Sequence, residues 1–248
     1  MRPVLLVTGG SRGIGASTAQ LAAARGYDVC LSYAGRKGAA DEVVRGCRGV
    51  GARALAVQTD VSVESDVVAL FERVHRELGR LDVLVNNAGI LDRQSRVADL
   101  DADRIRRILD VNVVGAFLCA REAVRCMSVA RGGVGGAIVN VSSRAAVLGG
   151  AGEYVDYAAS KAALDAFTVG LAREVADDGV RVNGVRPGLI RTEIHAAGGE
   201  PGRVDRLAAT VPMGRGGEAE EVAEAILWLA SGASSYVTGT MLDVSGGR

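Results

Sequence analysis

The chain is poor in lysine, and its positive charge does not exceed its negative charge. Lysine and arginine together number 29, but only Lys37 and Lys161 are lysines, and 29 acidic residues bring the net charge to zero. Proteins that bind nucleic acid or an acidic membrane surface carry a basic excess, so this balance argues against both partners. The scarcity of lysine also makes the position of Lys161, four residues after Tyr157, worth explaining.

Paired cysteines and long apolar runs are also missing. The four cysteines show neither a C-x-x-C pair nor a cysteine–histidine spacing, so we expect free thiols in a reducing compartment and no metal site. The apolar run near the N-terminus, Val4–Val7, is far too short for a signal peptide or a membrane span. We therefore predict a soluble, cytoplasmic protein.

Aromatic residues make up 4% of the chain, although 48% of it is hydrophobic, so alanine, valine and leucine must fill the core. Short apolar segments alternate with helical patterns, which indicates an α/β fold with a parallel sheet covered on both faces. The predicted strands are Val4–Thr8, Asp28–Tyr33, Arg53–Gln58, Val83–Asn86, Ala137–Ser142, Arg181–Arg186 and Met241–Val244. Helices are predicted to begin near Gly13, Ala39, Glu64, Asp103, Tyr154 and Ala219.

No linker or repeat interrupts this alternation, so we predict one domain over residues 1–248. Gly132–Gly136 is interpreted as a tight loop between a helix and a strand. The segment Ala196–Gly217 is different, because glycines and prolines bracket a short amphipathic piece, Arg203–Thr210. This pattern favours a substrate flap at about residues 193–217, the alternative being an ordinary surface excursion.

A glycine-rich turn, Thr8–Gly15 (TGGSRGIG), follows the first predicted strand and opens a helix. Its glycines are spaced G-x-x-x-G-x-G instead of G-x-G-x-x-G, but the physical requirement is the same. Glycine allows the backbone to approach a pyrophosphate, which then lies at the positive end of the helix. The turn therefore predicts a dinucleotide site.

The end of the second predicted strand indicates which dinucleotide is bound. A site for NAD places a carboxylate there for the ribose 2′-hydroxyl, but no acidic residue lies between Asp28 and Asp41. Arg36 follows the strand and Arg12 lies in the glycine-rich turn. Two guanidiniums without an acid favour a 2′-phosphate, so we expect NADP(H) rather than NAD.

Tyr157 and Lys161 share one face if the segment is helical, because residues four apart are neighbours on a helix. An ammonium beside a phenol in a desolvated site lowers the pKa of the tyrosine toward the range of proton transfer. Arginine would not replace a compact ammonium that must also bind a sugar hydroxyl. The pair therefore predicts acid–base chemistry, against the simpler reading of two residues on a solvated helix surface.

Together these motifs resemble the short-chain dehydrogenase/reductase family over Val4–Gly247. The other residues that carry the resemblance are Asp60, Val61, Asn86–Gly89, Asn112, Val141–Ser143, Arg186–Gly188 and Thr192. The resemblance implies a single Rossmann-like domain, doubly wound, with a seven-stranded parallel sheet in the order 3-2-1-4-5-6-7. It also implies a homotetramer or homodimer that pairs through the helices containing Asn112 and Tyr157.

The family assigns roles to matching positions. The implied catalytic residues are Asn112, Ser143, Tyr157 and Lys161, with Tyr157 donating or accepting the proton. The implied cofactor-binding residues are Gly9, Ser11, Arg12, Gly13, Ile14, Gly15, Tyr33, Arg36, Asp60, Val61, Asn87, Ala88, Gly89, Tyr157, Lys161, Pro187, Gly188, Ile190 and Thr192. The reaction implied is hydride transfer between nicotinamide and a carbonyl or secondary alcohol.

One spacing departs from the family pattern. Its serine commonly lies about thirteen residues before the tyrosine, whereas Ser143 precedes Tyr157 by fourteen. We place the extra residue in Gly149–Asp156. Ser142 therefore remains an alternative, and we favour Ser143 because adjacent side chains of an extended strand point to opposite sides.

The sequence does not define the substrate. The chain resembles both 3-oxoacyl-carrier-protein reductases and glucose-dehydrogenase-like members, and the acidic Asp177 and Asp178 argue mildly against a carrier protein, although Arg125 and Arg131 could serve it. The pocket candidates are Leu91, Arg93, Gln94, Ala145–Gly150, Glu153, His195 and Met213. The competing functions are a carbonyl reductase, an NAD-dependent polyol or sugar dehydrogenase, a dehydratase, epimerase or enoyl reductase, and a non-catalytic regulatory protein that binds a dinucleotide.

Overall fold

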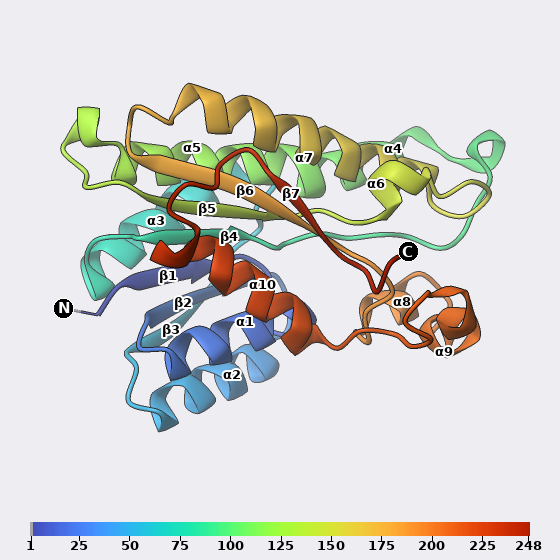
Figure 1. Cartoon of the computed structure of the whole chain (residues 1–248), viewed down its shortest axis with the longest axis horizontal. Helices are drawn as coiled ribbons and strands as arrows, with labels where there is room; N and C mark the ends of the chain where they lie inside the picture. Colours follow the sequence, from blue (N-terminus) through green and yellow to red (C-terminus); the bar gives the residue numbers. More distant parts are fainter. Residues whose placement is uncertain (1) are drawn as a thin grey trace.

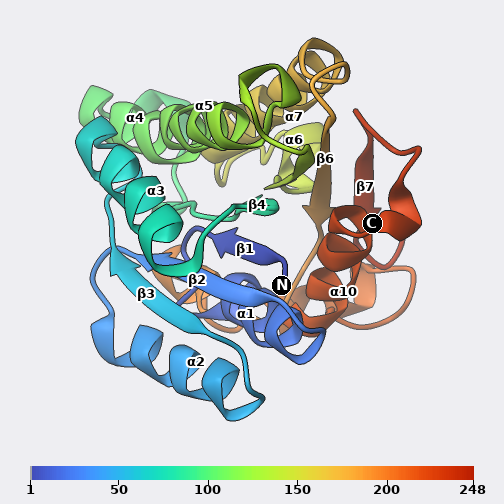
Figure 2. The ribbon, with the colours of Figure 1, turned by 90° about the vertical axis from the view of Figure 1, so that its left-hand side faces the viewer.

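The computed structural model describes residues 2–248 and contains one seven-stranded parallel sheet in the order β3-β2-β1-β4-β5-β6-β7. The strands are β1 (Val4–Val7), β2 (Asp28–Tyr33), β3 (Ala54–Gln58), β4 (Val83–Asn86), β5 (Gly136–Val141), β6 (Val180–Pro187) and β7 (Met241–Val244). Helices cover both faces of this sheet (Figures 1 and 2). The predicted fold class and strand order are therefore confirmed.

The main helices are α1 (Gly13–Ala24), α2 (Lys37–Gly49), α3 (Glu64–Leu78), α4 (Ala102–Leu109), α5 (Gly115–Met127), α7 (Val155–Glu174) and α10 (Ala219–Ala230). Alternation along β1 explains the two layers of core. Leu5 and Val7 pack with residues of α1, α2 and α10, whereas Val4 and Leu6 pack with residues of α3, α5 and α7. Because helices cover both faces of the sheet, β1 and β2 are buried throughout, and most of their residues are apolar.

The predicted elements are in the right places, and their ends differ from the structure by at most two residues. Gly136, predicted as loop, begins β5, and Lys37 begins the helix that was expected near Ala39. The helix expected near Asp103 is divided into α4 and α5, and several short elements were not predicted. Three of these are the short helices α6 (Ala145–Leu148) and α8 (Ile194–Ala197), and the π-helical turn, Asp110–Val114, between α4 and α5. All three lie close to the cavity described below.

The predicted flap leaves the sheet after β6 and returns before α10. It contains α8 and α9 (Arg203–Leu207), which lie beyond one end of the sheet (Figure 1). Its two ends meet in an isolated parallel bridge between Ile190 and Gly217. Within residues 2–248, no helix has the length and apolar character needed to cross a membrane, and no group of three histidine, cysteine or acidic side chains could hold a metal ion.

Candidate active site

A cavity of about 450 Å³ runs along the carboxyl ends of the central strands. In parallel α/β sheets this edge is where ligands bind, because the loops after neighbouring strands meet there. The cavity is lined by all of the predicted catalytic and cofactor-binding residues except Gly15 and Asn112, which lie behind its wall. The sequence therefore brings these residues to one place, although their individual roles do not follow from position alone.

The glycine-rich turn has the geometry that its sequence requires. Gly9 has a φ of +65°, in the left-handed region that disfavours other residues, and a Cβ there would lie 3.0 Å from the Cα of Ala88. At Gly15, in the first turn of α1, a Cβ would lie 2.5 Å from the carbonyl oxygen of Gly9. The turn therefore folds tightly on itself and on the end of β4, and leaves backbone exposed at the start of α1, where an anion would be stabilised.

Asn87 holds this turn against the end of β4. Its Nδ2 donates to the carbonyl oxygens of Thr8 (2.8 Å) and Gly9 (3.1 Å), and the Thr8 hydroxyl accepts from the backbone N–H groups of Asn87 and Ala88 at 3.0 Å each. The Asn87 side chain therefore fixes the walls of the cavity and points toward the protein backbone.

Arg12 and Arg36 line the cavity at its outer end, where they precede α1 and α2 respectively. In the part of the chain that the structure describes, neither forms an ion pair, although most other arginines do. The neighbouring Lys37, in contrast, is paired with Asp41 at 2.6 Å. Two free guanidiniums beside the glycine-rich turn match the donor set that a 2′-phosphate needs.

Tyr157 lies at the inner end of the cavity, on the first turn of α7. Burial raises the pKa of its phenol to about 12, and a side-chain hydrogen bond with Ser143 acts in the opposite direction. The sequence led us to expect that Lys161 lowers this pKa, and that expectation is wrong for this structure. The ammonium lies 5.7 Å from the centre of the tyrosine ring, and burial outweighs the remaining influences.

Lys161 is itself buried, with 3% of its surface exposed, and its Nζ donates to the carbonyl oxygen of Val141 at 2.7 Å. Burial lowers the pKa of this ammonium to about 8, while the carboxylate of Asp165, one turn further along α7, acts to raise it. A buried ammonium whose pKa lies close to neutral pH is a candidate for proton chemistry. Buried lysines with a purely structural role are rare.

Asn112 lies within the unpredicted π turn and is buried behind the cavity. Its Oδ1 accepts from the backbone N–H of Ile90 at 2.8 Å, and its Nδ2 donates to the Ile90 carbonyl oxygen at 2.9 Å and to the Ser160 hydroxyl at 3.0 Å. Single π turns often occur at functional sites because the extra residue redirects side chains. Here Asn112 connects the loop after β4 to the helix that carries Tyr157 and Lys161.

Ser142 and Ser143 point in different directions, as expected for the end of a strand. Ser142 is buried, and its hydroxyl donates to the backbone carbonyl of Lys161 at 3.1 Å. Ser143 has the hydrogen bond with Tyr157, and its Oγ accepts from the backbone N–H of Ala145 at 3.1 Å. Ser142 thus supports the packing of β5 on α7, while Ser143 stands beside the phenol.

The inner end of the cavity contains some of the pocket candidates and lacks others. Leu91, Ala145, Leu148, Gly150, Glu153 and His195 line it, whereas Arg93, Gln94, Ala146, Val147, Gly149 and Met213 do not. Met213 is mostly exposed, and Gln94 donates to Glu200 of the flap at 2.8 Å. Sequence reasoning missed Tyr154, Ile194 and Arg203, which also line this end. The extra residue between Ser143 and Tyr157 was the signal that could have pointed to Tyr154.

The flap is attached to the loop after β5 through Arg203. This buried guanidinium bonds both carboxylate oxygens of Glu153 and lies 3.0 Å from the Oε2 of Glu200. It also lies over the ring of Tyr154, 5.3 Å from the ring centre, and the Tyr154 hydroxyl donates to the carbonyl of Gly198 at 3.3 Å. Charged and aromatic contacts together hold the flap against the residues that precede α7.

Comparisons with known proteins identify the family. The family model described as enoyl-(acyl carrier protein) reductase matches residues 9–248. The chain is 56% identical to the uncharacterized oxidoreductase YgfF of Escherichia coli (strain K12), over 99% of both chains. It is 44% identical to the cis-4-hydroxycyclohexanecarboxylate dehydrogenase of Sinomonas cyclohexanicum, over 98% of this chain and 95% of the relative.

Among solved structures, a short chain dehydrogenase from Burkholderia cenocepacia J2315 in complex with NADP has a TM-score of 0.91. It is 36% identical, and the match covers 99% of this chain and 97% of that one. The protein is therefore an α/β oxidoreductase with a doubly wound parallel sheet. Within that class, the chain belongs to the short-chain dehydrogenase/reductase family.

Proposed function

We propose that this protein is an NADP(H)-dependent oxidoreductase that interconverts a compact ketone and the corresponding secondary alcohol, with Tyr157 as the proton donor and acceptor. The observation that carries the proposal is the position of this phenol. It lies beside Ser143 and Lys161 at the inner end of a cavity whose outer end is the glycine-rich turn with two unpaired arginines. Proton chemistry and a dinucleotide site thus share one cavity.

The residues of the cavity fit a bound dinucleotide. Gly9 and Gly15 leave the space that a Cβ would fill, Asp60 and Val61 line the wall after β3, and Pro187, Gly188, Ile190 and Thr192 line the wall after β6. Arg12 and Arg36 would bind the 2′-phosphate, and the ammonium of Lys161 would bind ribose hydroxyls. When bound, NADP(H) supplies the hydride.

The chain's own groups supply position and the proton. The Ser143 hydroxyl would hydrogen-bond the substrate oxygen as negative charge develops on it, and the phenol of Tyr157 would donate its proton to that oxygen. Because burial keeps the phenol protonated, reduction is supported at neutral pH. Asn112, which is bonded to Ile90 and Ser160, would hold the path by which Lys161 exchanges protons with solvent.

The substrate is proposed to be compact because the buried ring of Tyr154 lines the cavity and its hydroxyl is bonded to Gly198 of the flap. We propose a six-membered ring ketone as the first candidate, because the Sinomonas cyclohexanicum relative is named for a hydroxycyclohexanecarboxylate.

The first test is to titrate the protein with NADPH and NADH by fluorescence, then to supply the tighter cofactor with a carbonyl panel. The panel contains acetoacetyl thioesters, α-diketones, aldoses and cyclic ketones, including 4-oxocyclohexanecarboxylate. We expect tighter binding of NADPH and oxidation of it by a cyclic ketone. Binding without turnover of any compound would contradict the enzymatic role and favour a regulatory protein.

The arginines give the matched test of cofactor choice. Arg12→Ala/Arg36→Ala should weaken NADPH binding by about a hundredfold or more, since two charged hydrogen-bonding partners are lost, and change NADH binding much less. Arg45→Ala, in the middle of α2 on the solvent side, is the control. Equal losses for the two dinucleotides would show that the 2′-phosphate is bound elsewhere.

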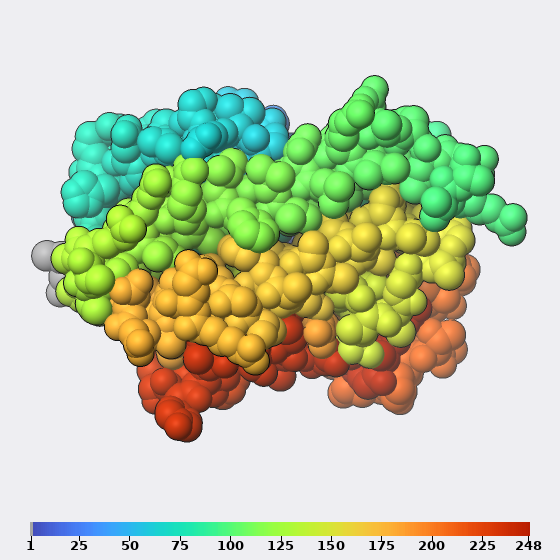
Figure 3. Space-filling view, turned by 90° about the horizontal axis from the view of Figure 1, so that it is seen from above, coloured from blue at the N-terminus to red at the C-terminus, as the bar shows by residue number. Residues whose placement is uncertain are grey.

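The proposal also includes a homotetramer or homodimer in the cytoplasm. Helices α4, α5 and α7 lie side by side on one face of the molecule (Figure 3). On this face Phe117 of α5 is 47% exposed and stacks on Phe167 of α7, with ring centres 3.8 Å apart, and Val114 is also exposed. Such apolar exposure on two helices favours a partner chain. Light scattering after size exclusion would measure the assembly, and a monomer would contradict it.

A further inference from the structure

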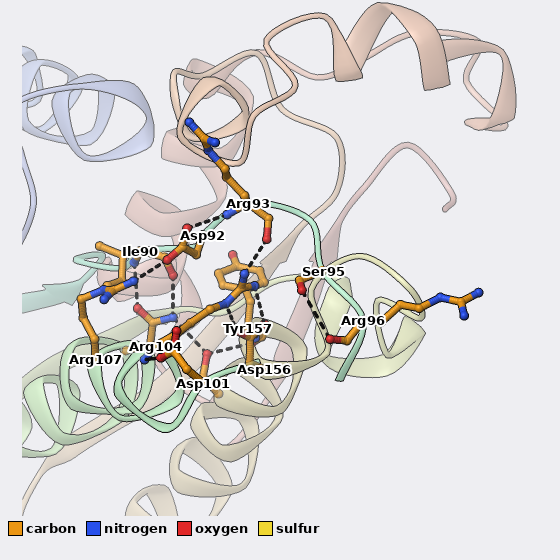
Figure 4. Close-up of polar contacts among 12 residues, drawn as sticks. Ile90, Asp92, Arg93, Ser95, Arg96, Asp101, Arg104, Arg107, Asp156 and Tyr157 are labelled. Atoms are coloured by element: carbon orange, nitrogen blue, oxygen red, sulfur yellow. Dashed lines mark hydrogen bonds and ion pairs between the residues drawn. The ribbon is translucent and has the colours of Figure 1, made fainter. Parts of the chain in front are cut away.

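A buried ion pair joins the helix before the π turn to the residue that precedes Tyr157. Arg104 of α4 donates from Nε to the Oδ2 of Asp156 at 2.7 Å and from Nη2 to its Oδ1 at 3.4 Å (Figure 4). The two side chains are only 10% and 4% exposed. A guanidinium presents a planar fork, so two bonds to one carboxylate fix its direction as well as its distance.

The same guanidinium also holds the loop that follows β4. Its Nη1 donates to the backbone carbonyl oxygen of Arg93 at 2.7 Å. The neighbouring Asp92 accepts from the backbone N–H of Arg93 at 2.7 Å and is paired with Arg107, one turn along α4. Two arginines on one face of α4 therefore fix Asp92 and Arg93, just after the cavity-lining Ile90 and Leu91.

The other end of the pair is next to the phenol. Asp156 lies in the first turn of α7, and its Oδ1 also accepts from the backbone N–H of Tyr157 at 2.9 Å. Neither Arg104 nor Asp156 lines the cavity. Any effect on chemistry must therefore pass through the two segments that they hold, the loop Ile90–Arg93 and the start of α7.

We propose that Arg104 and Asp156 form a positioning pair that fixes the phenol of Tyr157 relative to the substrate-binding loop Ile90–Arg93. The pair is not catalytic, because it does not touch the reacting groups. Its value lies in geometry: a proton donor that is displaced by about 1 Å can lose as much as a hundredfold in rate. The inference rests on the proposed function, in which Tyr157 transfers the proton.

Two variants separate positioning from stability. Arg104→Lys keeps the charge, but a single ammonium cannot reproduce the fork to Asp156 together with the bond to the Arg93 carbonyl. Arg104→Met/Asp156→Leu replaces the pair by apolar groups of similar volume, an exchange that buried ion pairs often tolerate. Because it also removes the partners of the Arg93 carbonyl and the Tyr157 N–H, its unfolding temperature is measured beside its kcat. Arg106→Gln/Asp103→Asn is the control, since it removes an ion pair of 3.0 Å on the exposed side of the same helix, where the side chains are 71% and 88% exposed.

For both test variants we expect kcat with NADPH and the best ketone of the panel to fall about tenfold to a hundredfold. The dissociation constant of NADPH should change by less than about twofold, because neither residue lines the cavity, and the control should match the unaltered protein. If Arg104→Met/Asp156→Leu unfolds at the same temperature as the unaltered protein and retains its kcat, the positioning pair is disproved.

Hydrogen exchange supplies a readout that does not depend on turnover. In Arg104→Lys, exchange should accelerate in the segments 90–96 and 155–161 together, because one guanidinium holds both. Acceleration confined to α4 would overturn the coupling. If the unaltered protein binds NADPH but turns over no ketone, the proposed function fails. Hydrogen exchange then tests by itself whether Arg104 and Asp156 couple the segments 90–96 and 155–161.

Discussion

The Nζ of Lys161 lies 2.7 Å from the carbonyl oxygen of Val141, the last residue of β5. This bond joins α7 to the end of β5, the strand that Ser142 and Ser143 follow. It is the only hydrogen bond of this ammonium within residues 2–248, and no carboxylate is paired with it there. A buried, singly bonded cation is costly for a folded protein, so its presence indicates function.

Replacing Lys161 by methionine should therefore stabilise the fold while abolishing turnover. The folded-state pKa of the lysine is lowered to about 8, from an ordinary value of 10.5. The unaltered protein thus carries the full cost of the buried charge below about pH 8, and that cost disappears as pH rises toward 10.5, where both states become neutral. Thermal unfolding of Lys161→Met should show a higher Tm at pH 7 and a shrinking gain at pH 9 and above. A lower Tm at pH 7 would contradict this reasoning.

The pH dependence of ketone reduction should follow Lys161 rather than Tyr157. Because kcat/KM for NADPH at saturating ketone reports the free enzyme, its fall should begin near pH 8, where the lysine loses its proton, while the phenol with a pKa of about 12 stays protonated. Asp165→Asn gives the sharper test. Removal of this carboxylate lowers the lysine pKa further, so the break in kcat/KM should move to lower pH. If kcat/KM falls at the same pH in Asp165→Asn as in the unaltered protein, the pH profile does not report the protonation of Lys161.

The sequence predicted the sheet and most of the cavity for physical reasons that can be named. Strands such as Asp28–Tyr33 and Val83–Asn86 were recovered with their ends because buried parallel strands are mostly apolar runs. Glycines in the turn after β1, and a tyrosine and lysine four apart, are local patterns. These patterns meet at the carboxyl edge of the sheet because all of its strands are parallel.

What the sequence missed depends on long-range contacts. The π turn at Asp110–Val114 has no local signature, and it is stabilised by Asn112 bonding to Ile90, 22 residues away. The pKa of Tyr157 was predicted in the wrong direction because helical spacing shows the neighbouring charge but not the burial. The contact of Arg203 with Glu153, 50 residues apart, likewise could not be read from either segment.

Gly15→Ala should destabilise the protein and weaken dinucleotide binding. A Cβ at this position would lie 2.5 Å from both the Asn87 Nδ2 and the Gly9 carbonyl oxygen, so the turn after β1 would have to move. Gly38→Ala is the matched control, because Gly38 lies in the first turn of α2 with nothing within 4 Å of the added Cβ. The control should gain about 0.5–1 kcal/mol through its helix propensity. The two variants are compared by denaturant unfolding and by titration with NADPH. If both have the same free energy of unfolding, the turn after β1 can move to accept the added Cβ.

Tyr154 should limit the size of the substrate. Its side chain is buried, lines the inner end of the cavity, and donates to the Gly198 carbonyl at 3.3 Å. Tyr154→Ala removes the ring and opens this end under the flap. The ratio of kcat/KM for a 4-phenyl-substituted cyclohexanone to that for cyclohexanone should therefore rise by about tenfold or more, since burial of one additional aromatic group contributes a few kcal/mol.

Tyr154→Phe keeps the ring and loses only the hydroxyl. If the ring sets the size limit, this variant should keep the substrate preference of the unaltered protein and show only a small loss from the weaker contact with Gly198. A matching rise in both variants would assign the limit to the hydrogen bond that holds the flap. No change in either variant would place the limit elsewhere, with Leu148, which also lines the cavity, as the next residue to change. The pair of variants therefore separates the shape of the cavity from the closure of its flap.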